Sequence, residues 1–171
     1  MCIRDRVETG LAFLDHMLVS LAKHARFDLS LSARGDLHVD DHHTVEDTAI
    51  AVGRALSDIL ADRAGISRFG YAFAPLDEAL ARSVVDFSGR PWPRVELRLK
   101  REKIGDVASE NLTHFLNSLA IEAGAALHVD VLCGSNDHHK AEAAFKATAM
   151  ALRNAVRRDG TGVPSAKGTL Q

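Results

Sequence analysis

The chain contains an internal duplication, and this repeat constrains its fold more than any other feature. When the sequence is shifted against itself by 98 positions, seven apolar or small residues around His16 align with identical residues around His114. After a two-residue length difference, a second motif of the form Asp-His-His-x-x-Glu also aligns. The matched polar residues are His16 with His114, Asp41–His43 with Asp137–His139, and Glu46 with Glu142.

The first copy is predicted to run helix, strand, loop, helix. Leu11 to about Ala25 has helical spacing, and Phe27–Ala33 alternates as a strand does. A polar loop follows, and a second helix is expected from about His43 to Ala61.

The second copy predicts the same order, with helices at Leu112–Gly124 and His139–Arg157 around a strand at Ala126–Leu132. Strands are also expected within Tyr71–Phe87 and at Arg94–Arg101. The prediction is an α+β fold of two fused halves related by a pseudo-twofold axis, each a β-sheet covered by two helices. The halves are expected at residues 1–66 and 67–171.

The first half is predicted to be truncated. Only 15 residues precede His16, whereas a long strand-like stretch precedes His114. By comparison of the two copies, roughly 25 to 30 residues are expected to be missing. The opening letters MCIRDR do not continue the repeat and are interpreted as foreign sequence.

Composition excludes several classes of function. The net charge is −2 with scattered Lys and Arg, so no basic stripe is available for nucleic acid. No apolar run is long enough for a membrane-spanning helix, and no signal peptide is recognisable. Cys2 and Cys133 lack metal or disulfide spacing. A cytoplasmic protein is predicted.

The duplicated motif predicts a metal centre. His42 and Glu46 are four residues apart, so they share one helix face and suit one cation. His43 points about 100° away and cannot easily serve the same ion. The second copy repeats this arrangement with His138, His139 and Glu142, and the matched His16 and His114 would complete the sites.

An isolated histidine pair is more often a surface or capping feature, but a duplicated set with a matched Glu favours metal. His24, His38 and His128 have no counterpart and are interpreted as structural. Asp41 and Asp137 are expected either to cap their helices or to orient a ligand imidazole. Imidazole and carboxylate ligands fit Mn, Fe, Ni, Co or Zn, and the residues alone do not choose.

Several strings resemble the imidazoleglycerol-phosphate dehydratases of histidine biosynthesis. They are FLDHML, DDHHTVEDTAIAVGRAL, PLDEALA, DFSGRP, NDHHKAEAAFKA and PSAKGTL. The resemblance is ordered and runs from Thr9 to Leu170.

This resemblance implies a fold like domain 2 of ribosomal protein S5, and a lyase that dehydrates imidazoleglycerol phosphate to imidazole acetol phosphate. It implies two Mn²⁺ per site, and a cubic shell of 24 subunits built from trimers, with sites between subunits. It also implies a polar active-site role for Asp77 and phosphate binding by five residues, which are Arg68, Arg90, Lys146, Ser165 and Lys167.

From the spacing, the ligands are expected to divide crosswise. One metal would take His42, Glu46, His114 and His139, and the other would take His16, His43, His138 and Glu142.

The resemblance further implies a preceding strand with a catalytic Glu, which Glu8 does not replace. Two alternatives remain open. One is a dinuclear metallohydrolase acting on a small phosphate ester, and the other is a non-enzymatic metal-binding shell protein.

Overall fold

A computed structural model describes residues 6–165 and 168 of the chain. It contains four helices and eight strands over this range. In chain order they are β1 (Arg6–Glu8), α1 (Ala12–Ala25), β2 (Ser30–Ser32), α2 (His42–Leu60), β3 (Phe69–Leu76), β4 (Ala79–Asp86), β5 (Trp92–Glu96), β6 (Lys103–Ile104), β7 (Val107–Ala108), α3 (Ser109–Glu122), β8 (Ala126–Cys133) and α4 (Asp137–Ala155).

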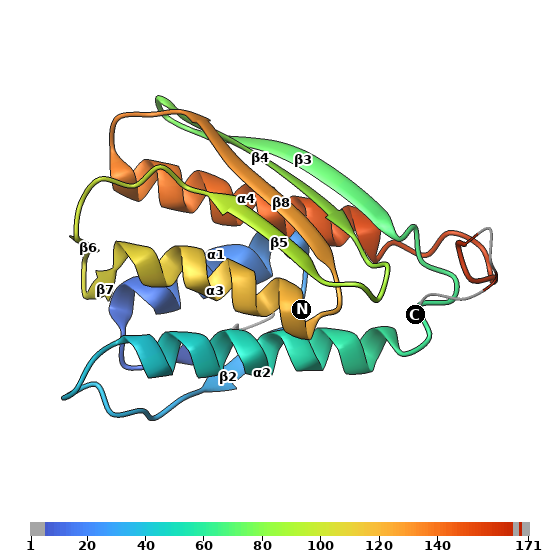
Figure 1. The fold of residues 1–171 in the computed structure, drawn as a ribbon, viewed down its shortest axis with the longest axis horizontal. Coiled ribbons are helices and arrows are strands. Elements are labelled where there is room, and N and C mark those ends of the chain that lie inside the picture. The colour runs from blue at the N-terminus through green and yellow to red at the C-terminus, as the bar shows by residue number, and fades with distance from the viewer. Residues whose placement is uncertain (1–5, 166–167, 169–171) are drawn as a thin grey trace.

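The second half forms a four-stranded sheet in the order β3-β4-β8-β5. The β3–β4 hairpin closes through a two-residue turn, Asp77–Glu78, and β4 pairs antiparallel with β8. β5 runs parallel to β8, with α3 as the connection between them. Figure 1 shows α4 and α3 beneath one face of this sheet.

The first half repeats part of this arrangement. β1 runs parallel to β2, with α1 between them, just as β5 runs parallel to β8. Within the described range, β2 pairs only with β1, whereas β8 has a neighbour on each side. Beside β2 lies a groove of about 590 Å³, lined by apolar residues of β2 and α2 such as Leu31, Val52 and Ile59.

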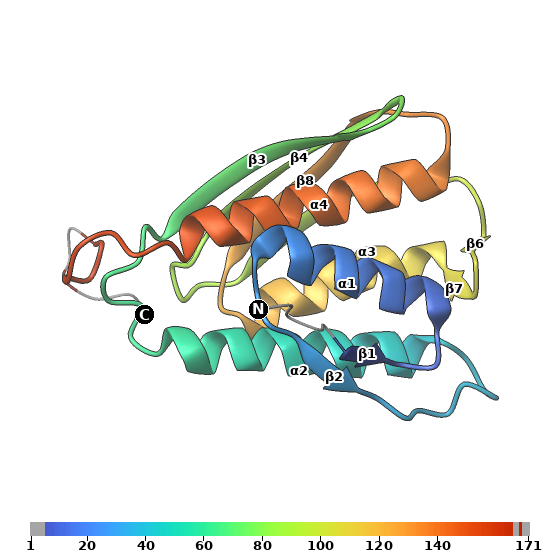
Figure 2. The ribbon, with the colours of Figure 1, turned by 180° about the vertical axis from the view of Figure 1, so that it is seen from behind.

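The helices of the two halves pack against each other crosswise, α1 on α4 and α2 on α3 (Figures 1 and 2). One continuous apolar core fills the space between these helices and the sheet. Phe115 of α3 and Phe145 of α4 are fully buried, with ring centroids 5.6 Å apart. The four helices begin at the same end of the molecule (Figure 1), so they bring their first turns together.

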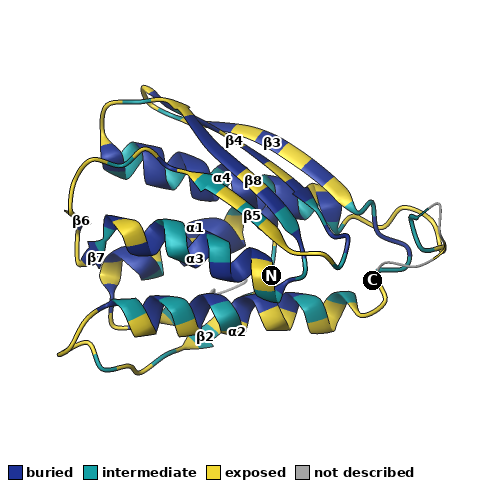
Figure 3. Cartoon of the chain, in the orientation of Figure 1, coloured by how far each residue is buried: buried dark blue, intermediate teal, exposed yellow. Residues whose placement is uncertain are grey.

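The outer face of the large sheet carries exposed aromatic side chains. Figure 3 shows buried and exposed residues alternating along β3. Phe69, Tyr71 and Phe73 point outward from this strand, and Trp92 of β5 is also exposed. None of the described helices is long and apolar enough to cross a membrane.

The predicted fold class is confirmed, and every predicted helix is present within a few residues of its expected bounds. Two strand predictions were wrong in extent. In Phe27–Ala33 only Ser30–Ser32 is a strand, because this is the stretch that pairs with β1 among the described residues. Instead of Arg94–Arg101, the strand is Trp92–Glu96, because this is the stretch that pairs with β8.

The division into halves at residue 66 stays a prediction. It falls in the connection between the end of α2 at Leu60 and the start of β3 at Phe69.

Candidate metal centre

Two groups of three potential ligands lie at the common end of the helices. In each group, the ligand atoms all lie within 4.8 Å of one another. We call these groups the α1–α4 triad, which is His16, His138 and Glu142, and the α2–α3 triad, which is His42, Glu46 and His114. Each triad therefore draws ligands from both halves of the duplication.

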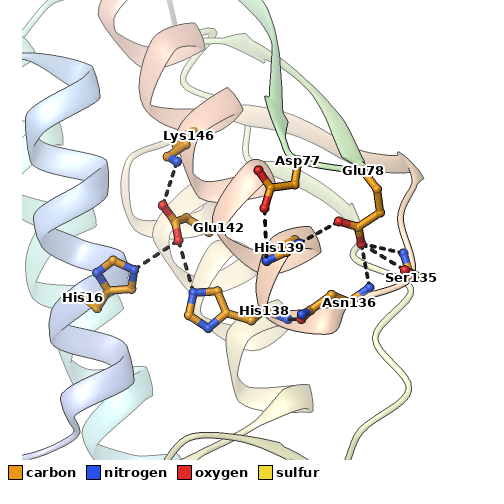
Figure 4. Close-up of polar contacts among 9 residues, drawn as sticks. All are labelled: His16, Asp77, Glu78, Ser135, Asn136, His138, His139, Glu142 and Lys146. Carbon is orange, nitrogen blue, oxygen red and sulfur yellow. Dashed lines mark hydrogen bonds and ion pairs between the residues drawn. The ribbon is translucent and has the colours of Figure 1, made fainter.

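In the α1–α4 triad, both imidazoles approach the same carboxylate oxygen (Figure 4). The Nε2 atoms of His16 and His138 lie 3.1 Å and 3.2 Å from Glu142 Oε2. Lys146 Nζ lies 2.7 Å from the other oxygen. Burial raises the pKa of Glu142, but hydrogen bonds from Lys146 and His16 outweigh it and lower the pKa to about 2. The carboxylate is therefore ionised at neutral pH, as a metal ligand must be.

The α2–α3 triad has the same composition with a different internal geometry. His114 Nε2 lies 3.1 Å from Glu46 Oε1, and His42 Nε2 lies 3.8 Å from Glu46 Oε2. The two imidazole rings are stacked, with centroids 4.8 Å apart. The Nδ1 atom of His42 lies 3.0 Å from Asn111 Oδ1, which leaves Nε2 directed toward the triad.

The other two predicted ligand histidines, His43 and His139, belong to neither triad. His43 Nδ1 lies 3.1 Å from Asp36 Oδ2, and His139 Nδ1 lies 2.6 Å from Glu78 Oε2. These hydrogen bonds raise the pKa of both imidazoles. Since neighbouring helix positions diverge, the two side chains point away from the triads of their own chain.

Asp77 lies beside one of these outer histidines. Its Oδ2 atom is 3.7 Å from His139 Nε2, and its side chain is largely exposed (Figure 4). The backbone φ of Asp77 is +46°, in the left-handed region that the tight hairpin turn requires.

Three of the residues expected to bind phosphate lie away from the triads. Arg68 precedes β3 and Arg90 follows β4, so both lie at the end of the sheet opposite the Asp77–Glu78 turn. Arg68 makes a bidentate ion pair with Asp86 and donates to Pro164 O, next to Ser165. Lys146 instead lies with the α1–α4 triad, and Lys167 lies outside the described residues.

The sequence also matches a known family. Residues 9–152 match the family described as imidazoleglycerol-phosphate dehydratase. The chain belongs to the imidazoleglycerol-phosphate dehydratase family.

Curated relatives carry the same name. The chain is 58% identical to the imidazoleglycerol-phosphate dehydratase of Candida glabrata, over 96% of the chain and 79% of the relative. It is 55% identical to that of Schizosaccharomyces pombe, over 96% of the chain and 77% of the relative. It is 56% identical to that of Phytophthora nicotianae over 98% of the chain, but it spans only 37% of that longer protein.

Solved dehydratase structures share the fold. The crystal structure of the Staphylococcus aureus enzyme superimposes with a TM-score of 0.85 at 37% identity, covering 91% of this chain and 88% of the other. The Pyrococcus furiosus structure, solved with (S)-C348, gives a TM-score of 0.86 at 37% identity, covering 97% of this chain and 90% of the other.

The interpretation of Asp41 and Asp137 as helix caps was wrong. Asp41 lies at the N-cap position of α2 but makes no side-chain cap bond, and Asn136 rather than Asp137 caps α4. Asp41 accepts a hydrogen bond from Ala108 N, and Asp137 accepts from the backbone of Lys100 and Arg101. Both carboxylates therefore anchor the segment between β5 and α3 onto the helix starts. Asp41 also hydrogen-bonds the side chain of Asn111, and so contacts His42 only through Asn111.

Three residues that hydrogen-bond the candidate ligand imidazoles were missed from the sequence, namely Asn111, Asp36 and Glu78. Asn111 lies one turn before His114 on α3, but it contacts His42 on α2, so its spacing does not predict this contact. Asp36 and Glu78 lie on other elements, so no spacing relates them to His43 and His139.

The donor set fits a divalent metal. Each triad combines two imidazoles with one carboxylate and contains no thiolate. Imidazole suits Zn²⁺, Fe²⁺ and Ni²⁺, and carboxylate suits Mn²⁺, so the mixed set is compatible with any of these cations.

Proposed function

We propose that this chain is a hydro-lyase that removes water from imidazoleglycerol phosphate to give imidazole acetol phosphate, in histidine biosynthesis. The observation that carries the proposal is the duplicated pair of triads, each with two histidines and one glutamate, within a chain of this family. In the reaction, a carbon-bound proton and a hydroxide leave adjacent side-chain carbons, and the resulting enol becomes the ketone.

Two Mn²⁺ ions are the proposed cofactors, one for each triad. When bound, they supply Lewis-acid and template chemistry for an imidazole ring. His16, His138 and Glu142 would hold one ion, and His42, Glu46 and His114 would hold the other. The lowered pKa of Glu142 supports this role, because the carboxylate needs no deprotonation to bind a cation.

We further propose that neither site is complete within one chain. His43 and His139 point away from the triads, so each would ligate an ion held by another copy. The same argument applies to phosphate binding, because Arg68 and Arg90 lie at the opposite end of the sheet from Asp77. The exposed aromatic face of β3 supports self-association, and a 24-subunit shell built from trimers is the assembly we propose.

The chain's own residues would then bind and orient the substrate. Arg and Lys side chains suit a phosphate dianion, and Arg can bind it in a bidentate manner. We propose Arg68, Arg90, Ser165 and Lys167 for this contact, together with Lys146 beside Glu142. Asp77, whose carboxylate lies 3.7 Å from His139 Nε2, is proposed to hydrogen-bond the substrate near the reacting carbons.

We place the reaction in the cytoplasm, since a chain with two widely separated cysteines suits a reducing compartment.

An assay with imidazoleglycerol phosphate, run on Mn²⁺-loaded protein, tests the proposal. We expect imidazole acetol phosphate as product, and we expect its formation to be lost in the Glu142→Gln variant. Release of inorganic phosphate would instead favour a metallohydrolase. Mn²⁺ binding without turnover of any phosphorylated imidazole would favour a metal-binding shell protein.

A further inference from the structure

His43 and His139, the two histidines that point away from the triads, share a carboxylate contact that the duplication does not explain. In both, a carboxylate from a different element contacts Nδ1. A second carboxylate, Asp77, lies 3.7 Å from His139 Nε2, which is beyond hydrogen-bond distance. The carboxylates are not themselves matched by the duplication. Asp36 lies in the loop between β2 and α2, whereas Glu78 lies in the β3–β4 turn.

Glu78 is firmly held in its position. Its Oε1 atom accepts hydrogen bonds from Ser135 N at 2.9 Å and from Asn136 N at 2.8 Å. Its Oε2 atom lies 2.6 Å from His139 Nδ1 (Figure 4). The carboxylate therefore bridges the hairpin turn to the loop that leads into α4, with both oxygens engaged.

This bridge controls which nitrogen of His139 can bind a cation. An ionised carboxylate only accepts hydrogen bonds, so the Nδ1 atom must carry the proton and donate it. In the neutral imidazole, the lone pair then lies on Nε2. Asp36 imposes the same choice on His43, through contacts of 3.1 Å and 3.3 Å to its two oxygens.

We infer that Glu78 and Asp36 are positioning residues, which hold His139 and His43 as Nδ1–H tautomers and so present Nε2 outward for metal ligation. The role in metal ligation rests on the proposed function. The tautomers of the two imidazoles can be measured without metal, so that test is independent of the proposed function. Carboxylate partners of this kind fix ring orientation and raise ligand basicity at metal sites. Each outward histidine would thereby reach a neighbouring copy's ion as a preorganised ligand.

The first measurement is the tautomer of His139 in the metal-free full chain, by long-range ¹H–¹⁵N NMR of the imidazole. In the unsubstituted protein we expect Nδ1–H. Glu78→Ala should lose this form, whereas Glu78→Gln should keep it, because its side-chain carbonyl can still accept the hydrogen bond. The control is Asp58→Ala, which removes the same charge from an exposed position near the end of α2.

The second measurement is Mn²⁺ affinity, by competition with a chelator. Loss of such a carboxylate typically weakens metal binding by about 10- to 100-fold. We expect a loss of this size for Glu78→Ala, a smaller loss for Glu78→Gln, and unchanged binding for Asp58→Ala. Asp36→Ala should cause the same loss of the Nδ1–H tautomer and of Mn²⁺ affinity through His43. If Glu78→Ala does not fold, the Asp36→Ala variant tests the inference instead.

The inference is overturned if Glu78→Ala and Asp36→Ala leave the Nδ1–H tautomers in place. It is equally overturned if the tautomers change but Mn²⁺ affinity stays at the control value. Absence of Mn²⁺ binding by the unsubstituted protein would instead contradict the proposed metal function, and the tautomer measurement would still decide whether the carboxylates orient the imidazoles.

Discussion

At the scale of single residues, one buried carboxylate on the large sheet is paired with two arginines. Asp130 on β8 lies on the outer face of the sheet but is itself almost fully buried. It accepts hydrogen bonds of 2.8 Å from Arg82 on β4 and from Arg94 on β5. The hydrogen bond from Arg82 lowers the pKa of Asp130, burial opposes this, and Arg94 adds to the lowering. The pair of arginines thus joins three adjacent strands.

This arrangement predicts a pH dependence of stability. Because the pKa of Asp130 in the folded chain lies below its ordinary value of 3.8, the stabilisation is complete above that value and is lost as pH falls through the folded pKa. Asp130→Asn should therefore reduce the free energy of unfolding at pH 7, by about 1 kcal/mol given half-exposed arginines. The free energy of unfolding of this variant should also decrease less steeply as pH falls below about 4. Chemical denaturation across pH checks this, with Asp58→Asn as control, and parallel curves for the variant and unsubstituted chains would contradict it.

At the scale of elements, the packing of α2 on α3 depends on a glycine. A Cβ atom on Gly53 would lie 2.9 Å from Leu119 O and 2.7 Å from Glu122 Cβ, both on α3. The two helices therefore approach closely only because position 53 has no side chain. Since each helix carries part of the α2–α3 triad, this contact also sets the distance between the side chains of the triad.

Gly53→Ala should destabilise the chain although alanine favours helices. Helix propensity alone would stabilise by about 1 kcal/mol. Overpacking against backbone atoms costs about 1–3 kcal/mol, and we expect it to dominate. The measurement is the denaturation midpoint, compared with Gly162→Ala, where an added Cβ would meet no atom within 4 Å. A higher midpoint for Gly53→Ala than for the unsubstituted chain would show that α2 and α3 are not held this closely.

The elements also show what the sequence can and cannot predict. The helices were predictable because apolar residues recur with helical spacing over many positions, and this signal lies within the segment itself. Short strands were not, because their extent depends on a partner far along the chain, as β2 depends on β1. The histidines and glutamates of the triads stood out because they occur twice. Glu78 and Asp36 did not, because only the folded chain brings them to His139 and His43.

At the scale of the whole molecule, the proposed sites make metal binding and subunit binding one process. If His43 and His139 ligate ions of neighbouring copies, removing the metal removes contacts between chains. We predict that a strong chelator shifts the assembly to smaller species and that added Mn²⁺ restores it. Size-exclusion chromatography with light scattering measures this. An elution profile that stays unchanged after confirmed metal loss would contradict it.

The most direct measurement of the central claim is anomalous scattering from crystals of the Mn²⁺-loaded protein. We predict one ion at the α1–α4 triad, completed by His43 of a neighbouring copy. A second ion is predicted at the α2–α3 triad, completed by His139 of a neighbouring copy. In both, Nε2 of the outward histidine should be the ligand atom. Anomalous peaks away from the triads, or a single ion bound by both His42 and His43, would contradict the account.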